Sequence, residues 1–177
     1  LQDAANVEMH GAATASEAAK ATTGAPADDP YAHVNTVDHD RDVWMELLDA
    51  HASIRRTVWH NQTMVGAVTE SDDPKVSAKI KEHTMAMQTR MKAGASVRNW
   101  DPVFAEMFEK HGAMKLEVVE TEKGVRITET SNDPEALALL RSHAMGVSEF
   151  IREGGEASSR ETKPIRVGYP LPPTEVS

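Results

Sequence analysis

The chain of 177 residues contains no cysteine, few aromatic side chains and no long apolar run. Without cysteine it can form no disulfide, no thiolate nucleophile, no Cys-ligated zinc or iron–sulfur cluster and no Cys-x-x-Cys-His attachment of a c-type haem. No stretch approaches the roughly 20 apolar residues of a membrane-spanning helix, so the sequence predicts no membrane span. Any metal must therefore be held by nitrogen, oxygen or thioether ligands.

Positive charge is also scarce in this sequence. Lys and Arg together number 19 against 28 Asp and Glu, which gives a formal net charge of −9. Because a phosphate backbone is bound by a basic surface, we expect no nucleic-acid partner. Histidine and methionine are plentiful, with 8 and 9 copies, and are the candidate metal ligands.

The two ends of the chain offer few large apolar side chains. The first 36 residues are rich in Ala, Thr, Asp and Gly and predict a disordered or extended arm. Because the sequence starts at Leu1 with this composition, we expect the mature form of an exported, periplasmic protein. Residues 156–177 are Pro-rich and predict an extended tail. The arm and the tail are the candidate contacts with a protein partner or in a homo-oligomer, with Tyr169 and Leu171 as anchors in the tail.

The region between the ends contains an internal repeat with an offset of 60 residues. TESDDPKVSAKIKEH at 69–83 aligns without a gap with ETSNDPEALALLRSH at 129–143, and ELLDAH at 46–51 aligns with EMFEKH at 106–111. So many matches in one register indicate a duplication. We expect one domain over residues 37–155, built from repeat units at about 40–95 and 100–155.

Each repeat unit predicts the order helix, strand, strand, helix. Apolar side chains recur at helical spacing in the first helix, and Trp44, Leu47, Leu48 and His51 form the apolar stripe of the first copy. The extended runs that follow are residues 54–59 and 65–69 in the first unit, and 114–119 and 124–128, joined by the turn TEKG, in the second.

The second helix of each unit has clear start and stop signals. It follows SDDP or SNDP, in which Asp is the expected N-cap and proline takes the first helical position. It ends at Gly94 or Gly154. Since each hairpin is too small to be stable alone, we expect an α+β fold in which both join into a four-stranded antiparallel sheet, covered by helices and related by a pseudo-twofold axis.

Four histidines recur at the repeat offset and lie on the apolar stripes of their helices. His51 and His83 in the first unit correspond to His111 and His143 in the second. One interpretation is structural, with each imidazole donating a hydrogen bond to a backbone carbonyl. The other is metal binding, because duplication of a ligand pair gives the same pattern, and imidazole suits copper, zinc, nickel and haem iron.

Two arrangements of a metal site are compatible with the repeat. A pseudo-twofold axis would place His83 and His143 at the two axial positions of one b-type haem. We favour this pair because mid-helix positions are rigid. The apolar wall would be formed by Trp44, Phe104 and Phe108.

The second arrangement is local to each unit. It pairs His51 with His83, and His111 with His143, in two small copper sites with thioethers such as that of Met87 nearby. Methionine at helical spacing is, however, more often flexible core filling than a ligand.

The sequence contains no glycine-rich phosphate loop, no HExxH and no nucleophile elbow, so it does not indicate an enzyme. We expect an exported, His-ligated metal-binding protein, with haem iron ahead of copper, for electron transfer or metal handling. The alternative is a non-enzymatic binding or scaffold subunit in which the histidines are structural and the arm and tail make protein contacts.

The motifs of the repeat also carry a resemblance. TESDDP with the His and Met that follow it, WDPVFAEMFEKH and GVRITETSNDP resemble a family of uncharacterised exported bacterial proteins that contain this duplicated unit. The resemblance covers about residues 43–155. It implies export and these domain boundaries, and it implies no activity.

Overall fold

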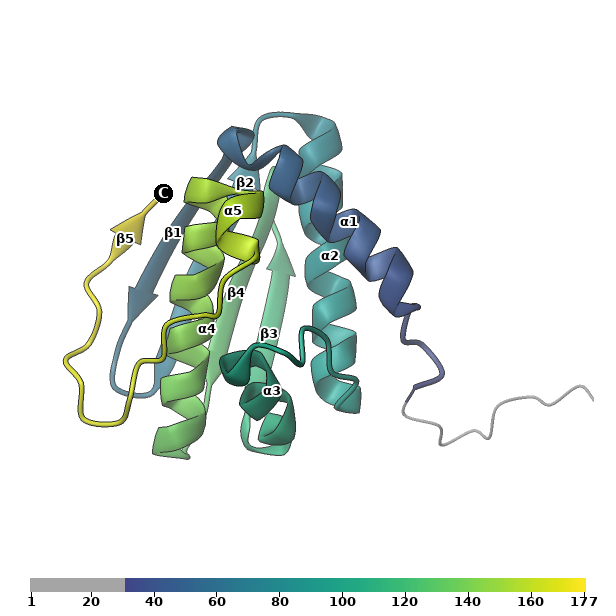
Figure 1. Cartoon of the computed structure of the whole chain (residues 1–177). Coiled ribbons are helices and arrows are strands. Elements are labelled where there is room, and N and C mark those ends of the chain that lie inside the picture. Colours follow the sequence, from purple (N-terminus) through teal and green to yellow (C-terminus); the bar gives the residue numbers. More distant parts are fainter. Residues whose placement is uncertain (1–30) are drawn as a thin grey trace, which may run out of the picture.

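The structure is a computed structural model that describes residues 31–177 of the chain. These residues form an α+β fold in which five helices accompany a five-stranded antiparallel sheet of order β3-β4-β2-β1-β5 (Figure 1). Most of the predicted arm therefore lies outside the described residues, and the helical part of the chain begins at Val37.

The predicted order helix, strand, strand, helix is found twice. The first unit comprises α1 (Val37–Asp49), β1 (Ile54–His60), β2 (Met64–Ser71) and α2 (Pro74–Ala93). The second comprises α3 (Pro102–Glu109), β3 (Lys115–Glu120), β4 (Gly124–Thr130) and α4 (Pro134–Glu153). Short 3-10 turns, η1 (His51–Ser53) and η2 (His111–Ala113), follow α1 and α3, and the chain ends with α5 (Gly155–Ser158) and β5 (Glu175–Val176).

The predicted number of four strands is wrong, because the C-terminal tail adds a fifth. β5 pairs with β1 through Thr57 with Val176 and Val58 with Glu175. At this edge Ser177 also exchanges two backbone hydrogen bonds with Arg56, of 2.9 and 2.8 Å. A two-residue strand has no periodicity in the sequence. It forms because the outer edge of β1 would otherwise leave backbone groups unpaired.

The two hairpins join through β2 and β4, which are the corresponding strands of the two units. Ala67 of β2 faces Ile127 of β4, its partner at the offset of 60 residues. On either side, Val65 faces Glu129 and Thr69 faces Val125. The central register of the sheet is therefore centred on one repeat-equivalent pair.

The predicted starts and ends of α2 and α4 are confirmed, and α3 begins in the same way. Asp73, Asp101 and Asp133 are the N-caps of α2, α3 and α4, and each carboxylate accepts backbone N–H groups of the first turn. A proline follows each cap and takes the first helical position, where no hydrogen-bonding N–H is needed. Gly94 and Gly154 end α2 and α4 with φ of +67° and +64°, a region that favours glycine.

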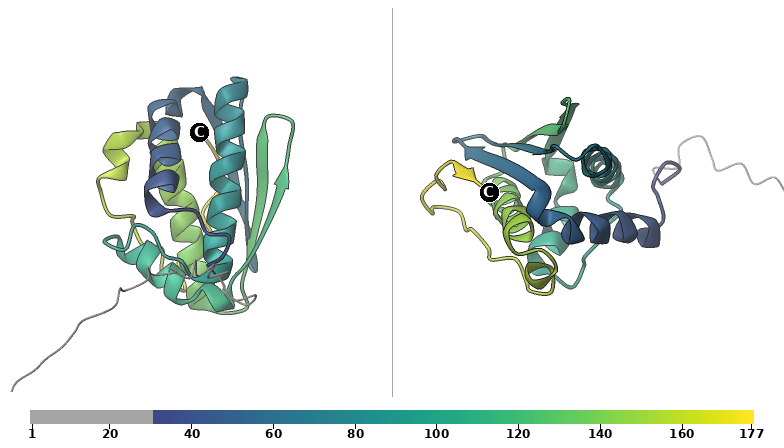
Figure 2. Two further views of the ribbon diagram at one scale, coloured as in Figure 1. Left: turned by 90° about the vertical axis from the view of Figure 1, so that its right-hand side faces the viewer. Right: turned by 90° about the horizontal axis from the view of Figure 1, so that it is seen from above.

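The long helices α2 and α4 lie on one face of the sheet (Figures 1 and 2). Each of them packs on strands of the other unit. α2 packs on β2, β3 and β4, whereas α4 packs on β1 and β2. The short helices form an outer layer, with α1 on α2 and α3 on α4. The space bounded by the two long helices, the sheet and this outer layer contains the site described below.

Two buried ion pairs fasten the outer helices. Arg90 Nε of α2 donates to Asp40 Oδ2 of α1 at 2.5 Å, with both side chains at most 4% exposed. Arg98 Nε donates to Asp101 Oδ2 at 3.0 Å, and Thr162 of the tail donates to the same oxygen from its N–H at 3.0 Å and its hydroxyl at 2.8 Å. The tail is thereby fixed to the start of α3.

The C-terminal tail lies beside α4 of the same molecule (Figure 1). The Ile165 N–H donates to Ser142 Oγ of α4 at 2.7 Å, while Tyr169 stays 63% exposed. Its expected role in contacts with a partner stays a prediction. Between residues 31 and 177, no helix combines the length and the apolar character needed to cross a membrane.

Candidate ligand-binding cavity

A cavity of about 1170 Å³ lies between the long helices and the sheet, and most of its wall is apolar. It is larger than the roughly 300–1,000 Å³ of most small-molecule pockets. All eight residues that the sequence singled out as ligands or apolar wall border it: Trp44, His51, His83, Met87, Phe104, Phe108, His111 and His143. Residues from both repeat units thus meet around one space.

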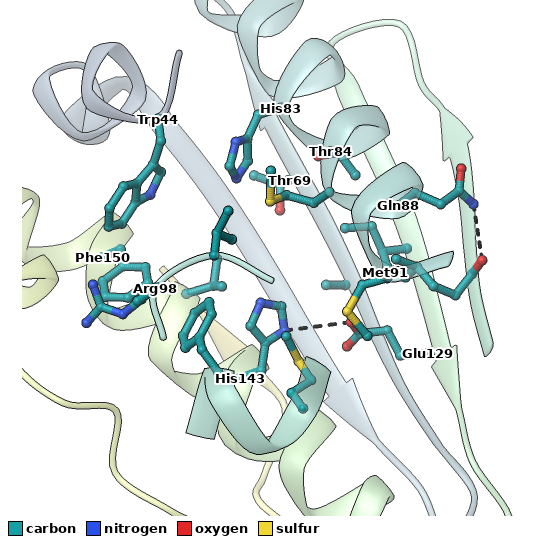
Figure 3. A pocket seen from close by; sticks show the side chains of 18 of the residues that line it. Trp44, Thr69, His83, Thr84, Gln88, Met91, Arg98, Glu129, His143 and Phe150 are labelled. Carbon is teal, nitrogen blue, oxygen red and sulfur yellow. Dashed lines mark hydrogen bonds and ion pairs between the residues drawn. The ribbon is translucent and has the colours of Figure 1, made fainter. Parts of the chain in front are cut away.

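His83 and His143 face this cavity from opposite long helices (Figure 3). His83 lies in the middle of α2 and His143 in the middle of α4, as the repeat requires. The Nδ1 atoms of both rings are buried and have no hydrogen-bond partner among residues 31–177. Buried polar atoms are nearly always paired in folded proteins, so two imidazoles with unbonded nitrogens on facing walls of one cavity mark this space as a candidate ligand site.

The His83 imidazole is held in its neutral form. Burial lowers the pKa of His83 to about 4, the nearby His143 acts in the same direction, and Asp40 opposes both. A neutral imidazole keeps a nitrogen lone pair free at physiological pH. The ring is therefore ready to bind a metal without first losing a proton.

His143 has different surroundings. Its Nδ1 lies 3.7 Å from Oε1 of Glu129, a buried side chain of β4 (Figure 3). Its ring also meets the Phe104 ring edge-on, with centroids 5.3 Å apart. A carboxylate at the second nitrogen of an imidazole orients the ring and raises its basicity as a ligand. The position equivalent to Glu129 in the first unit is Thr69, which carries a hydroxyl in place of a carboxylate.

His51 follows the structural interpretation. Its Nδ1 lies 2.8 Å from the carbonyl oxygen of Ile151, in the last turn of α4, where carbonyls lack helical partners. The ring packs under Gly154, and the His111 ring packs in the same way under Gly94. Each of these histidines thus supports the end of the long helix of the other unit, although both rings also border the cavity.

Aromatic rings and Arg98 form one side of the cavity. Trp44 meets Phe150 edge-on with centroids 5.6 Å apart, and the Arg98 guanidinium lies 4.1–5.7 Å from the ring centroids of Trp44, Trp100, Phe104 and Phe150. Arg98 has φ of +56°, a strained value for a residue with a side chain. Its hydrogen bonds to the carbonyls of Ser158 and Arg160 hold this conformation.

The sheet side of the cavity carries polar residues that the sequence analysis missed. Arg56, Thr69 and Glu129 border the cavity from β1, β2 and β4, and each is at most 8% exposed. The Arg56 Nη1 donates to Thr69 Oγ1 at 2.7 Å. One signal was present in the sequence, because Arg56 lies between Ile54 and Val58 on the inward face of a strand with period two.

The described residues form no compact cluster of metal ligands. Within residues 31–177, no three or more His, Asp or Glu side chains gather closely enough to hold a metal ion. The local pairs of His51 with His83 and of His111 with His143 therefore gain no further carboxylate or imidazole ligand there. Met87 borders the same cavity as these histidines.

Comparison of the chain with protein-family models, with curated proteins and with solved structures gave no match. The resemblance to a duplicated, exported bacterial family stays a prediction. The function has to be argued from the cavity itself.

Proposed function

We propose that the cavity binds one b-type haem, with His83 and His143 as its two axial ligands. The observation that carries the proposal is a pair of equivalent imidazoles on facing walls of a large apolar cavity, whose Nδ1 atoms make no hydrogen bond within residues 31–177. A haem suits an apolar enclosure, and imidazole is one of the side chains that hold its iron in proteins. We further propose that the protein is exported, as the sequence predicts.

The second part of this proposal is an approximate twofold relation between the repeat units. Its support is the register between β2 and β4, in which Ala67 faces its own equivalent, Ile127. On either side, the pair Val65–Glu129 becomes the pair Val125–Thr69 when each residue is replaced by its equivalent in the other unit. Such an axis relates His83 to His143. Two equivalent ligands on opposite sides of an axis suit one iron placed on that axis.

Cavity size favours haem over copper. A single copper ion would fill only a small part of about 1170 Å³ and would leave most of the apolar wall without contacts. A porphyrin would contact aromatic side chains such as Trp44 and Phe104. Haem is therefore preferred, and copper is the second metal to test.

The proposed ligation also indicates a role. If both His83 and His143 held the iron, no position would be left open for a substrate, which would suit electron transfer or haem handling better than catalysis. The protein then contributes the two ligands, an apolar enclosure and the tuning of each imidazole by its neighbours.

The experiment is titration of the purified chain with hemin, followed by absorption spectroscopy in the oxidised and reduced states. We expect one haem per chain and the spectrum of six-coordinate, low-spin iron. His83→Ala and His143→Ala should each abolish this spectrum, because both imidazoles would belong to one site. Half occupancy in a single variant would support local sites instead.

Two histidine controls separate ligation from general damage. His39→Ala removes an exposed imidazole bound to Glu82 and should leave haem binding unchanged. His51→Ala removes the bond to Ile151 and should lower the free energy of unfolding while leaving the absorption spectrum of bound haem intact. Low-spin spectra in both His83→Ala and His143→Ala would defeat the assignment of this pair.

A scaffold or binding subunit is the second candidate function. It is favoured by His51, whose ring supports a helix end, and by the exposed Tyr169 in a tail that is otherwise fixed to the chain. A colourless protein that takes up no haem or copper, yet assembles through the tail, would select this alternative.

A further inference from the structure

One buried cation on the cavity wall lacks a close counter-ion. Arg56 is 5% exposed, and among residues 31–177 no carboxylate lies within 4 Å of its guanidinium. Its backbone is fixed on both sides, by β2 through Thr69 and by Ser177 at the β5 edge. The side chain therefore cannot reach solvent by local fraying of the strand.

The hydrogen bonds of Arg56 are also incomplete. A guanidinium has five N–H donors. Nη1 donates to Thr69 Oγ1 at 2.7 Å, and the Nε donor is buried without any partner in the described chain. Burying a charge without pairing it is costly, so an unpaired arginine is rarely retained in a core for stability alone.

The surrounding charges do not complete the site. Glu129 on β4 and Glu175 on β5 act on Arg56 only at longer range, and each has a closer partner, His143 and Arg152 respectively. Burial lowers the pKa of Arg56 to about 10, so the guanidinium stays protonated at neutral pH. Arg56 is one of the residues that border the cavity.

We infer that Arg56 is an anion anchor and that the ligand of this cavity is an apolar molecule bearing a carboxylate. A carboxylate matches the planar donor pattern of a guanidinium and would supply the missing acceptor. The inference rests on the proposed function only in taking this cavity as the ligand site. Two sources share the chemistry: the propionates of a porphyrin, and the head group of a long-chain fatty acid.

The test compares each acid with its ester, in which the body of the ligand is kept and the charge removed. The probes are metal-free protoporphyrin IX and its dimethyl ester, then hexadecanoic acid and its methyl ester, with dissociation constants measured by fluorescence. For at least one pair we expect the acid to bind about 10- to 100-fold more tightly than the ester. Equal affinities within both pairs would overturn the inference.

Substitutions at neighbouring positions localise the effect. In Arg56→Met the preference for the acid should fall to about onefold, because the donors are gone while the length of the side chain is kept. Arg55→Met is the matched control, since Arg55 is exposed, bonds to Asp72 and does not border the cavity. It should leave the preference intact, and the same loss in both variants would overturn the anchor.

Thermal melting of the ligand-free protein excludes a merely structural role. Removal of an unpaired buried charge should leave the midpoint of Arg56→Met unchanged or raised. A lower midpoint together with an unchanged acid preference would assign Arg56 to the fold and overturn the inference. Because the porphyrin probe contains no iron, failure of ligation by His83 and His143 cannot mimic either result. A preference seen only with the fatty acid would support the anchor and argue against haem.

Discussion

The two halves of the cavity carry equivalent histidines in different surroundings. In the second unit His143 lies 3.7 Å from the Glu129 carboxylate and edge-on to Phe104. In the first unit the position equivalent to Glu129 is Thr69, whose hydroxyl accepts a hydrogen bond from Arg56. The backbone frame is repeated, whereas the polar groups beside each imidazole are not.

This difference makes the two sides of the cavity chemically unlike, although the order of helices and strands is the same in both units. The repeat places two imidazoles, and single positions on the sheet then decide the charge beside each one. A carboxylate beside an imidazole makes it a more strongly donating ligand, and this applies to His143, which faces Glu129. The equivalent position in the first unit carries the Thr69 hydroxyl instead. The buried cation Arg56 lies in the first half, and the equivalent position in the second half is Leu116.

The largest expected effect tests how each half fastens its outer helix. Asp101→Ala would leave the Arg98 guanidinium without its carboxylate, and Asp40→Ala would do the same to Arg90. Loss of one partner of a buried pair costs about 3–5 kcal/mol. Asp101→Ala should cost more, because its carboxylate also accepts bonds from Val103 and Thr162. Chemical denaturation of both variants measures this, and a larger loss in Asp40→Ala would reverse the ranking.

Acid should destabilise the protein through His83. The pKa of His83 is about 4 in the folded chain, below its ordinary 6.5, so its contribution to stability is complete above pH 6.5 and is lost as the pH falls toward 4. The loss is on the order of 3 kcal/mol, since each pKa unit corresponds to about 1.4 kcal/mol.

The measurement is the free energy of unfolding between pH 7 and pH 4 for the wild type and for His83→Gln. We expect the fall in stability over this range to be smaller in the variant by the contribution of one histidine. Identical pH profiles would show that the His83 ring is solvated.

The two helix-ending glycines should respond unequally to alanine. A Cβ at Gly154 would lie 2.6 Å from the His51 ring, which is held by its bond to Ile151, and the ψ of −137° is poorly accessible to other residues. A Cβ at Gly94 would also meet a ring, that of His111 at 2.7 Å. The ψ of Gly94 is 23°, however, in the left-handed helical region that alanine tolerates at a cost of about 1–2 kcal/mol. The midpoint of thermal unfolding should therefore be lower in Gly154→Ala than in Gly94→Ala. Equal midpoints would count against a fixed His51 ring.

The smallest expected effect exchanges the polar neighbours of the two histidines in the haem-loaded protein. If His83 and His143 hold a haem as proposed, Glu129→Gln should raise the reduction potential and Thr69→Glu should lower it, because a carboxylate beside an imidazole that holds iron would stabilise the oxidised state. We expect shifts on the order of 60 mV, the one-electron equivalent of a tenfold change in equilibrium constant. Potentiometric titration measures both, and shifts of the same sign would contradict the proposed asymmetry.

The sequence predicted the local elements well because their signals are local. Asp caps followed by proline, terminal glycines and apolar spacing defined the helices, and the TEKG turn is confirmed by the hydrogen bond from Thr121 N–H to the Gly124 carbonyl. The offset of 60 residues also predicted which histidines would be equivalent, and that prediction needed no knowledge of contacts.

By itself, then, the sequence determined the repeated frame and the choice of imidazoles near an apolar face. Only the tertiary structure decided that His51 supports a helix end, that Glu129 lies beside His143 and that the tail pairs with the edge of β1. It also decided that Arg56 is buried with no carboxylate within 4 Å among residues 31–177. Each of these depends on groups far apart in the chain. Pairing between distant strands and helices sets hydrogen bonds and burial, whereas local sequence sets only backbone preference and periodicity.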